Sequence, residues 1–291
     1  MERRIVAIAG LGLIGGSIGL ALRNIRADVP EVVGYSRSRE SAQKALDCGA
    51  VDRIEASLSA AVRDADLVVL ATPILAIKDI LSEIAPCLLP GSVVTDVGST
   101  KAAILEWARQ HLPGGVYFVG GHPMAGKEKS GIDAAESTLF HGCTYCIVPA
   151  AGASQPAIDL VAGLARDLGG NPLLISAEAH DYLVAGISHL PYALASALVM
   201  TTMENPSWAE MSGLAASGFR DASRLASQHP VMTRDICLTN RDNLVSWIDD
   251  FTKELNRFRD LLIRDSDELE ERLALVRRLH QEWAQRYEER S

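Results

Sequence analysis

The chain has 291 residues, of which 48% are apolar and 22% charged, the balance of an ordinary globular protein. Its 28 basic and 37 acidic side chains give a formal charge of −9, which argues against nucleic acid as a partner because nucleic acid requires a basic face. There is no run of eighteen apolar residues and no apolar leader at the N-terminus. We therefore expect a cytoplasmic protein that does not span a membrane.

Strands and helices alternate through the first half of the chain. Apolar runs predict strands at 4–9, 31–35, 66–72, 92–96, 117–120, 144–148 and 171–175. Helices are predicted between them, among others at 14–26, 39–48 and 100–111. The unbroken apolar run 66–72 is typical of a strand buried on both faces. This alternation predicts an α/β fold with a mostly parallel sheet.

The second half of the chain contains no predicted strand. Residues 177–203 form one long helical run, in which Pro191 should kink or divide the helix. From Phe251 to Tyr287, apolar residues recur at steps of mostly three, four and seven, as in amphipathic helices. We therefore expect an α/β domain over 1–174 and an all-helical domain over 175–291.

Five cysteines, an odd number, fit a reducing compartment. Cys143 and Cys146 form a C-x-x-C pair, but they fall in a predicted strand, where side chains three residues apart point to opposite faces. The redox motif needs a turn that leads into a helix, and no second pair completes a zinc site. We therefore predict neither a redox pair nor a metal site.

A glycine-rich loop joins the first predicted strand to the first helix. Gly10, Gly12 and Gly15 match the G-x-G-x-x-G pattern in the strand-to-helix context that the pattern requires. Gly10 permits the tight turn, Gly12 admits a pyrophosphate, and Gly15 allows close packing of helix and strand. With Leu13 and Ile14 they are predicted to bind a dinucleotide at the helix N-terminus. The first domain is thus predicted to be Rossmann-type; a tight turn without a ligand is the alternative.

The end of the second strand should discriminate between NAD and NADP. An acidic residue there binds the ribose of NAD, but this chain has Ser36 and Arg37 instead. A hydroxyl and a guanidinium can hold a 2′-phosphate, whereas a carboxylate would repel it. We therefore expect NADP as the preferred cofactor. In the alternative, Arg37 and Arg39 are solvated and the protein uses NAD with a weak ribose contact.

Six segments of the chain occur together, in this order, in one enzyme family. They are residues 10–17, 72–73, 96–101, 121–126 (Gly-His-Pro-Met-Ala-Gly), 188–191 (Ser-His-Leu-Pro) and 218–224 (Gly-Phe-Arg-Asp-Ala-Ser-Arg). By these segments the chain resembles the prephenate/arogenate dehydrogenase family of tyrosine biosynthesis. The resemblance implies oxidative decarboxylation of prephenate or arogenate with hydride transfer to NAD(P)⁺, which gives 4-hydroxyphenylpyruvate or tyrosine. It also implies a homodimer formed through the helical domain.

The resemblance assigns catalytic roles to two residues near the strand ends. His122 becomes the base that accepts the proton of the substrate hydroxyl, for which imidazole has a suitable pKa. Ser99 contacts the same hydroxyl, although a helix N-cap is the alternative role for this serine. A loop-capping role is the alternative for His122. Thr72 and Pro73 are assigned to the cofactor site.

Further residues are assigned to the substrate. Arg224 would bind the ring carboxylate through its planar fork, with Arg220 as the competing candidate. His189 would lie near the substrate side chain, and Lys101 near the site, unless it is a plain surface lysine. Many members that use prephenate have a second histidine where this chain has Tyr192. Tyr192 therefore puts prephenate preference in doubt without establishing arogenate.

Two other functions fit the glycine loop. A β-hydroxyacid or imine reductase also combines such a loop with an all-helical second domain. A non-catalytic NADP-binding sensor would keep the glycines but would not need His122, Ser99 and Arg224 together. The segments at 121–126 and 218–224 favour the dehydrogenase over both alternatives.

Overall fold

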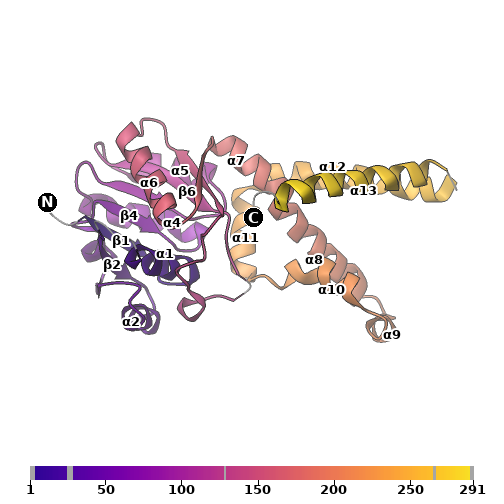
Figure 1. Cartoon of the computed structure of the whole chain (residues 1–291), viewed down its shortest axis with the longest axis horizontal. Coiled ribbons are helices and arrows are strands. Elements are labelled where there is room, and N and C mark those ends of the chain that lie inside the picture. Colours follow the sequence, from indigo (N-terminus) through magenta and orange to yellow (C-terminus); the bar gives the residue numbers. More distant parts are fainter. Residues whose placement is uncertain (1–3, 25–28, 128, 265–266, 289–291) are drawn as a thin grey trace.

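The computed structural model describes residues 4–24, 29–127, 129–264 and 267–288, which form an α/β unit and an extended helical unit (Figure 1). The strands are β1 (Ile5–Ala9), β2 (Glu31–Tyr35), β3 (Arg53–Ile54), β4 (Leu67–Leu70), β5 (Val93–Asp96), β6 (Tyr117–Pro123), β7 (Thr144–Pro149) and β8 (Asn171–Leu174). They form one sheet in the order β3-β2-β1-β4-β5-β6-β7-β8. The first six reproduce the dinucleotide-binding order.

All strand pairs are parallel except β6 with β7, so the prediction of a mostly parallel sheet is confirmed. The two-residue strand β3 was not predicted, because it is too short to show a period. The antiparallel β7 was also not foreseen as such. Its partner β6 runs two residues past Gly121, so that His122 lies at the carboxyl end of this strand.

The α/β unit has three layers, because alternate strand residues enter opposite cores. Val6 and Ile8 of β1 belong to one core, and Ala7 and Ala9 to the other. The first core contains α1 (Leu13–Arg23), α2 (Arg39–Asp47) and α6 (Gln155–Asp167). The second contains α3 (Leu58–Val62), α4 (Ile74–Ile84) and α5 (Ala102–His111), and the short turns η1 (Ala85–Cys87) and η2 (Ile132–Ala134) complete the unit. Residues 25 and 26, predicted to end the first helix, lie outside the described residues.

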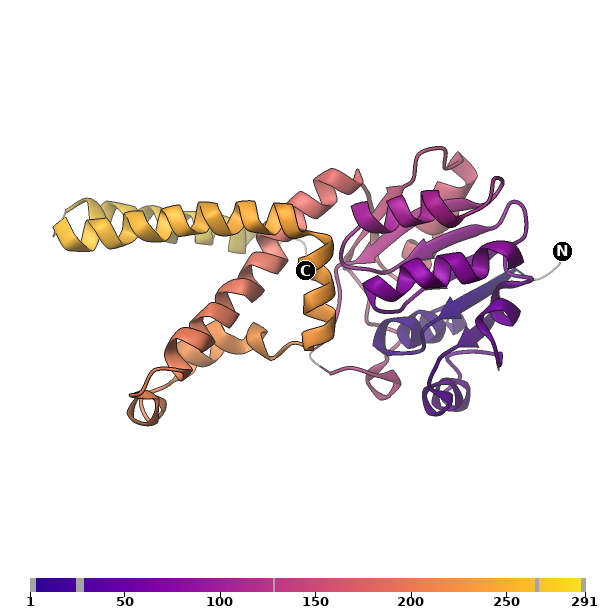
Figure 2. The ribbon, with the colours of Figure 1, turned by 180° about the vertical axis from the view of Figure 1, so that it is seen from behind.

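The helical unit begins after β8. It comprises α7 (Ala177–Val184), the π-helical turn η3 (Ala185–His189), α8 (Leu190–Met203), α9 (Trp208–Ser212), α10 (Ser217–Ser223), η4 (Arg224–Ser227), α11 (Pro230–Thr239), α12 (Arg241–Arg264) and α13 (Glu268–Glu288). Pro191 lies in the first turn of α8, directly after the π-turn. The run stays helical across this proline, and the expected kink or division takes the form of a π-turn that interrupts the α-helical hydrogen bonds just before it. From behind, α11 lies between the α/β unit and the other helices (Figure 2).

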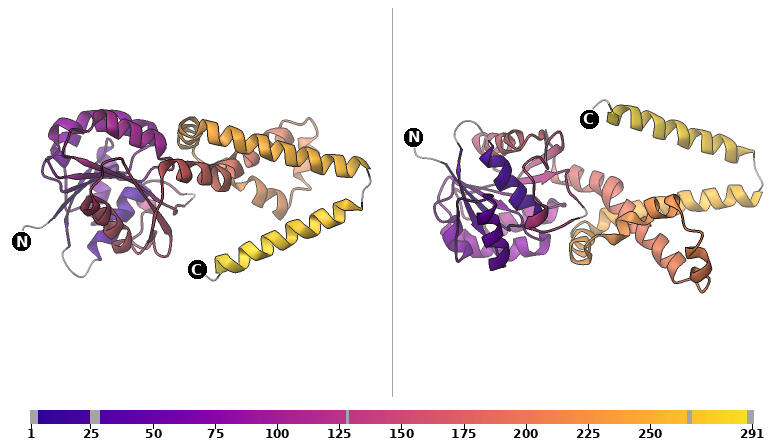
Figure 3. Two further views of the ribbon diagram at one scale, coloured as in Figure 1. Left: turned by 90° about the horizontal axis from the view of Figure 1, so that it is seen from above. Right: turned by 60° about the horizontal axis from the view of Figure 1, so that its bottom comes forward.

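Long apolar surfaces distinguish the helical unit. The helices α12 and α13 form a hairpin whose arms diverge (Figure 3), and the apolar side chains along them are exposed, among them Leu255, Leu262, Val276 and Trp283. The run Ala177–Met203 contains an eighteen-residue window that is apolar enough to cross a membrane, judged by length and composition alone. Core helices of globular proteins pass the same test, and this run holds buried polar residues that bond the α/β unit.

Candidate active site

The glycine loop has the geometry of an anion site. Gly10 has a φ of +103°, and a Cβ there would lie 2.3 Å from the Ala71 carbonyl oxygen. A Cβ on Gly15 would lie 2.0 Å from the Gly10 carbonyl oxygen, whereas one on Gly12 would meet open space. The helix α1 begins at Leu13 without a capping side chain, so its first N–H groups are available to a phosphate.

Two further observations fit a dinucleotide beside this loop. The Thr72 hydroxyl is buried without a hydrogen-bond partner in the described part of the chain, next to the Ala71 carbonyl that approaches Gly10. Such a buried hydroxyl costs free energy unless a ligand satisfies it. Pro73 precedes α4 in extended conformation. At the end of β2, Ser36 is half-buried and Arg37 is exposed to solvent.

His122 lies at the carboxyl end of β6, where parallel sheets place their ligands. Its ring is half-buried, and its Nδ1 lies 2.8 Å from Nε2 of His180 on α7. The two rings meet edge to face, with centroids 5.1 Å apart. Burial lowers the pKa of His122 well below 6.5, and the positive charge of Lys101 and the neighbouring His180 and His189 lower it further. His122 is therefore neutral at neutral pH, as a base must be.

Asp181 connects this histidine pair to the α/β unit. Its Oδ1 lies 2.8 Å from His180 Nδ1 and accepts the backbone N–H of Lys101 at 2.7 Å. Its Oδ2 accepts the N–H of Ala102 at 2.9 Å. Asp181 thus caps α5, which has no capping side chain of its own. The half-buried Ser99 lies two residues before the N-cap position, so the alternative N-cap role of this serine is wrong, and the helix begins later than predicted.

Lys101 and Asp96 form a fully buried ion pair behind the strand ends. The Lys101 ammonium donates to the Asp96 carboxylate and, at 2.7 Å, to the Gly121 carbonyl oxygen. Asp96 also accepts the N–H groups of Gly98 at 2.7 Å and Gly121 at 3.3 Å. Burial raises the pKa of Asp96 and lowers that of Lys101, and their mutual attraction opposes both shifts. Both members of the pair hydrogen-bond the backbone of Gly121, the residue before His122. This favours a positioning role for Lys101 over the expected contact with substrate.

The other residues predicted to bind the substrate lie on the helical unit. His189 is 4% exposed, and its Nδ1 lies 3.2 Å from the side-chain amide of Asn240, which donates to the Asp181 carbonyl oxygen at 2.7 Å. Burial lowers the pKa of His189 to about 4. Tyr192 is half-buried on α8, and Arg224 is exposed on η4, which packs against α8. The structure thus gathers the histidines at the junction of the two units and places Tyr192 and Arg224 on two elements that pack together, α8 and η4.

Sequence reasoning missed His180, Asp181 and Asn240. A signal for the first two was present, because a His-Asp pair interrupts an otherwise apolar helical run, and such a pair needs polar partners if it is buried. Asn240 gave no signal. Its importance depends on a fold that brings the start of α12 to α7.

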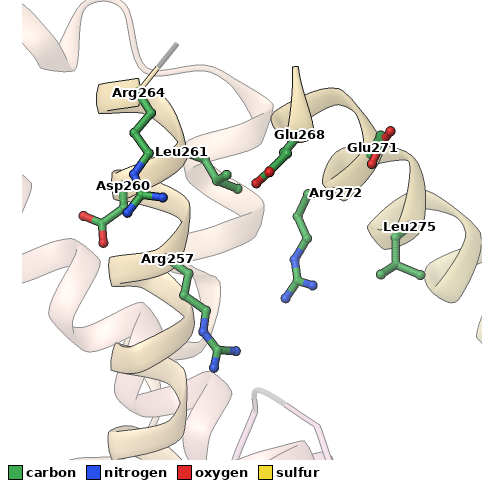
Figure 4. Close-up of a pocket in the computed structure, with 8 residues that line it drawn as sticks. All are labelled: Arg257, Asp260, Leu261, Arg264, Glu268, Glu271, Arg272 and Leu275. Carbon is green, nitrogen blue, oxygen red and sulfur yellow. The ribbon is translucent and has the colours of Figure 1, made fainter. Parts of the chain in front are cut away.

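A hollow elsewhere in the molecule carries none of these residues. It lies between α12 and α13 and is lined by Arg257, Asp260, Leu261, Arg264, Glu268, Glu271, Arg272 and Leu275 (Figure 4). Charges of both signs line it, and Arg272 bonds Glu254 across the hairpin. The ion pair joins α12 to α13, and the hollow is far in sequence from the glycine loop and from His122. It is therefore not a candidate for the active site.

Comparison with known proteins matches both halves of the chain. The family model for the prephenate dehydrogenase nucleotide-binding domain matches residues 18–173, and that for the prephenate dehydrogenase dimerization domain matches residues 176–280. Prephenate dehydrogenase of Bacillus subtilis (strain 168) is 36% identical over 265 residues, which cover 90% of this chain and 71% of the relative.

Two crystal structures are similar over almost the whole chain. Prephenate dehydrogenase from A. aeolicus, in complex with hydroxyphenyl propionate and NAD⁺, is 33% identical with a TM-score of 0.90, and covers 97% of this chain and 99% of its own. Synechocystis arogenate dehydrogenase is 31% identical with a TM-score of 0.83, and covers 96% and 99%. The reductase and the non-catalytic sensor are set aside on these matches. The chain belongs to the prephenate dehydrogenase family, NAD(P)-linked oxidoreductases that perform oxidative decarboxylation in tyrosine biosynthesis.

Proposed function

We propose that this enzyme oxidises prephenate or arogenate, with His122 as the base. The observation that carries the proposal is the position of His122. It is a neutral, half-buried histidine at a carboxyl strand end, and no residue in the described part of the chain bonds its Nε2. As hydride leaves the carbinol carbon, the substrate hydroxyl becomes acidic and needs an acceptor within hydrogen-bond reach. NAD(P)⁺, held at Gly10, Gly12 and Gly15, would accept the hydride.

Four other residues are proposed to hold the substrate. Ser99 follows the adjacent strand β5, and its hydroxyl can share the substrate hydroxyl with His122. Arg224 supplies a planar fork for the ring carboxylate, which must be held while its bonding electrons flow into the ring and CO₂ departs. His189 and Tyr192 face the side-chain end of the substrate. Tyr192 offers a neutral hydroxyl rather than a second imidazole, and this supports neither keto-acid nor amino-acid substrate over the other.

For the cofactor, we propose a preference for NADP. No acidic side chain occupies residues 36–39, and the exposed Arg37 is available to a 2′-phosphate beside Ser36. The loop and Thr72 would bind either cofactor in the same way.

We also propose a cytoplasmic homodimer that pairs through a domain that begins at residue 175. The relevant family model is named for dimerization. The exposed apolar side chains along α12 and α13 are more numerous than is usual on the surface of a monomeric protein, and such surfaces commonly pair with a second copy. A membrane role for the run Ala177–Met203 is disfavoured, because Asp181 and His189 on it are buried in hydrogen bonds that bilayer insertion would break.

The substitution His122→Asn tests the proposed base. We expect kcat to fall by about 10²–10⁴-fold with cofactor binding nearly intact, because a positioned base contributes about that factor. In the wild type, kcat should fall at acid pH, below the ordinary histidine range, and this limb should vanish in His122→Asn. If the variant keeps near-normal kcat and the same acid limb, the base lies elsewhere, and His189 is the next residue to test. Turnover of prephenate and arogenate with each cofactor identifies the substrate.

A further inference from the structure

A chain of hydrogen bonds runs from His122 into the helical unit. His122 Nδ1 lies 2.8 Å from His180 Nε2, and His180 Nδ1 lies 2.8 Å from Asp181 Oδ1. The Asp181 oxygens also accept the backbone N–H groups of Lys101 and Ala102, at 2.7 and 2.9 Å. Asp181 is 2% exposed and His180 1%. Among the described residues, the Asp181 carboxylate thus meets two backbone N–H donors and the His180 ring.

The Asp181 carboxylate, which can only accept, determines which ring nitrogens of His180 and His122 carry protons. Because Asp181 accepts, His180 donates through Nδ1, and a neutral His180 ring then presents a lone pair at Nε2. The bond between the two rings consequently requires the proton of His122 on Nδ1. The Nε2 of His122 is left with a lone pair, because the hydrogen bond to His180 uses Nδ1.

We propose that His180 and Asp181 are positioning residues that hold His122 in the tautomer whose Nε2 can accept the substrate proton. The proposal rests on the proposed role of His122 as the base. In the other tautomer, Nε2 would carry a proton and could accept none. Once His122 is protonated, its positive charge is stabilised by Asp181 through the ring of His180, as a buried carboxylate does for the histidine of a Ser-His-Asp triad.

The anchoring of Asp181 gives this tautomer its stability. Asp181 belongs to α7, but its carboxylate caps α5 of the α/β unit, where the helix dipole favours negative charge. The Asn240 amide holds the Asp181 carbonyl oxygen as well. The carboxylate therefore cannot rotate away from His180 without leaving two N–H groups of α5 unsatisfied.

Other titratable groups also surround His122. They come from the elements packed against it and are Asp96 (β5), Lys101 (before α5), Cys146 (β7, opposite His122 in the ladder) and His189 (π-turn). A substitution at Asp181 leaves all of them in place, so a change in tautomer reports on the hydrogen-bonded chain.

Nitrogen chemical shifts of ¹⁵N-histidine-labelled full-length protein distinguish the two tautomers without reference to activity. The His122 signals are assigned as those missing from His122→Asn. In the wild type we expect the proton of His122 on Nδ1. In Asp181→Asn the new amide can donate to His180, which reverses the direction of both hydrogen bonds, so the proton of His122 should shift toward Nε2. A proton on Nε2 in the wild type, or an unchanged tautomer in Asp181→Asn, would overturn the proposal even if His122 is the base.

Kinetics supply the second measurement. Asp181→Asn should lower kcat by about 10²-fold or more with KM nearly unchanged, because the wrong tautomer binds substrate but cannot take its proton. His180→Gln keeps an acceptor oxygen for His122 Nδ1, and His180→Leu does not. The glutamine variant should retain about tenfold more kcat than the leucine variant, the value of one hydrogen bond. Equal kcat in these two variants would refute the role of His180, even if Asp181→Asn fails to fold.

Thr239→Val is the matched structural control. The Thr239 hydroxyl lies 2.8 Å from that of Thr100, so it also joins the helical unit to the start of α5, but it does not touch the histidine chain. This variant should unfold at a lower temperature while keeping the wild-type tautomer and kcat. Loss of the Nδ1 tautomer in Thr239→Val would show that any loosening of the junction has this effect, and would refute a specific role for Asp181.

Discussion

Replacing Lys101 by Met should destabilise the fold strongly. Methionine keeps most of the length of the side chain and removes the ammonium that Asp96 faces. Both residues are 0% exposed, and Asp96 would retain only the N–H groups of Gly98 and Gly121. A buried charge left without its partner costs about 3–5 kcal/mol. At roughly 2–4 °C per kcal/mol for a domain of this size, the melting temperature should fall on the order of 10 °C.

The same substitution should move the pH profile in a defined direction. The positive charge of Lys101 is one of the causes that lower the pKa of His122, after burial itself. Without this charge the pKa rises, so the acid limb of kcat should move to higher pH. A residue that served only to fill space would change the melting temperature but leave this limb in place.

Calorimetry and the pH dependence of kcat measure the two effects. The double variant Asp96→Asn/Lys101→Met is the control, because removing both charges leaves none unpaired and should recover most of the lost stability. An unchanged melting temperature with a raised KM would refute this reasoning. It would instead support the contact with substrate that family resemblance assigns to Lys101.

Three further outcomes are expected. Arg37→Ala should weaken NADP use about 10- to 100-fold and NAD use far less, because a charge-assisted phosphate contact is lost; titration of both cofactors checks this, and equal weakening contradicts it. Gly15→Ala should abolish tight cofactor binding, since its Cβ would lie 2.0 Å from the Gly10 carbonyl oxygen; unchanged affinity by calorimetry would show that the loop shifts freely. The pKa of His189 is about 4 in the folded protein and about 6.5 in the unfolded chain. The unfolded state therefore binds a proton more readily below pH 6.5, and the free energy of unfolding is not reduced by this residue above that pH. About 3 kcal/mol should then be lost as the pH falls toward 4, and urea unfolding should show less of this loss in His189→Gln.

The features that sequence could predict are those with a local cause. The strand-glycine-helix pattern around Gly10 is local, and so are the alternation of strands and helices and the irregularity of the helix at Pro191. All three appear in the structure as expected. The position of His122 at a strand end also follows from its neighbours in sequence.

The features that sequence could not predict depend on residues far apart in the chain. Lys101 looks like a lysine at the start of a surface helix, and its burial follows only from Asp96 and the return of β6 beside it. Asp181 caps a helix 79 residues away, so no capping signal exists near α5 itself. Strand β3 has two residues and relies on the sheet rather than on its own propensity.

The buried polar groups at the junction link the proposed base, His122, to both units. Each of these groups would be costly alone, but Asp181, His180 and Asn240 satisfy one another and the N–H groups of α5. Loosening α7 from α5 would break several of these bonds at once. The proposed substrate residues Tyr192 and Arg224 lie instead on α8 and η4, where they are half-buried and exposed, respectively. On the proposed roles, the groups that orient the imidazole are buried at the junction, whereas those that hold the substrate remain accessible to it.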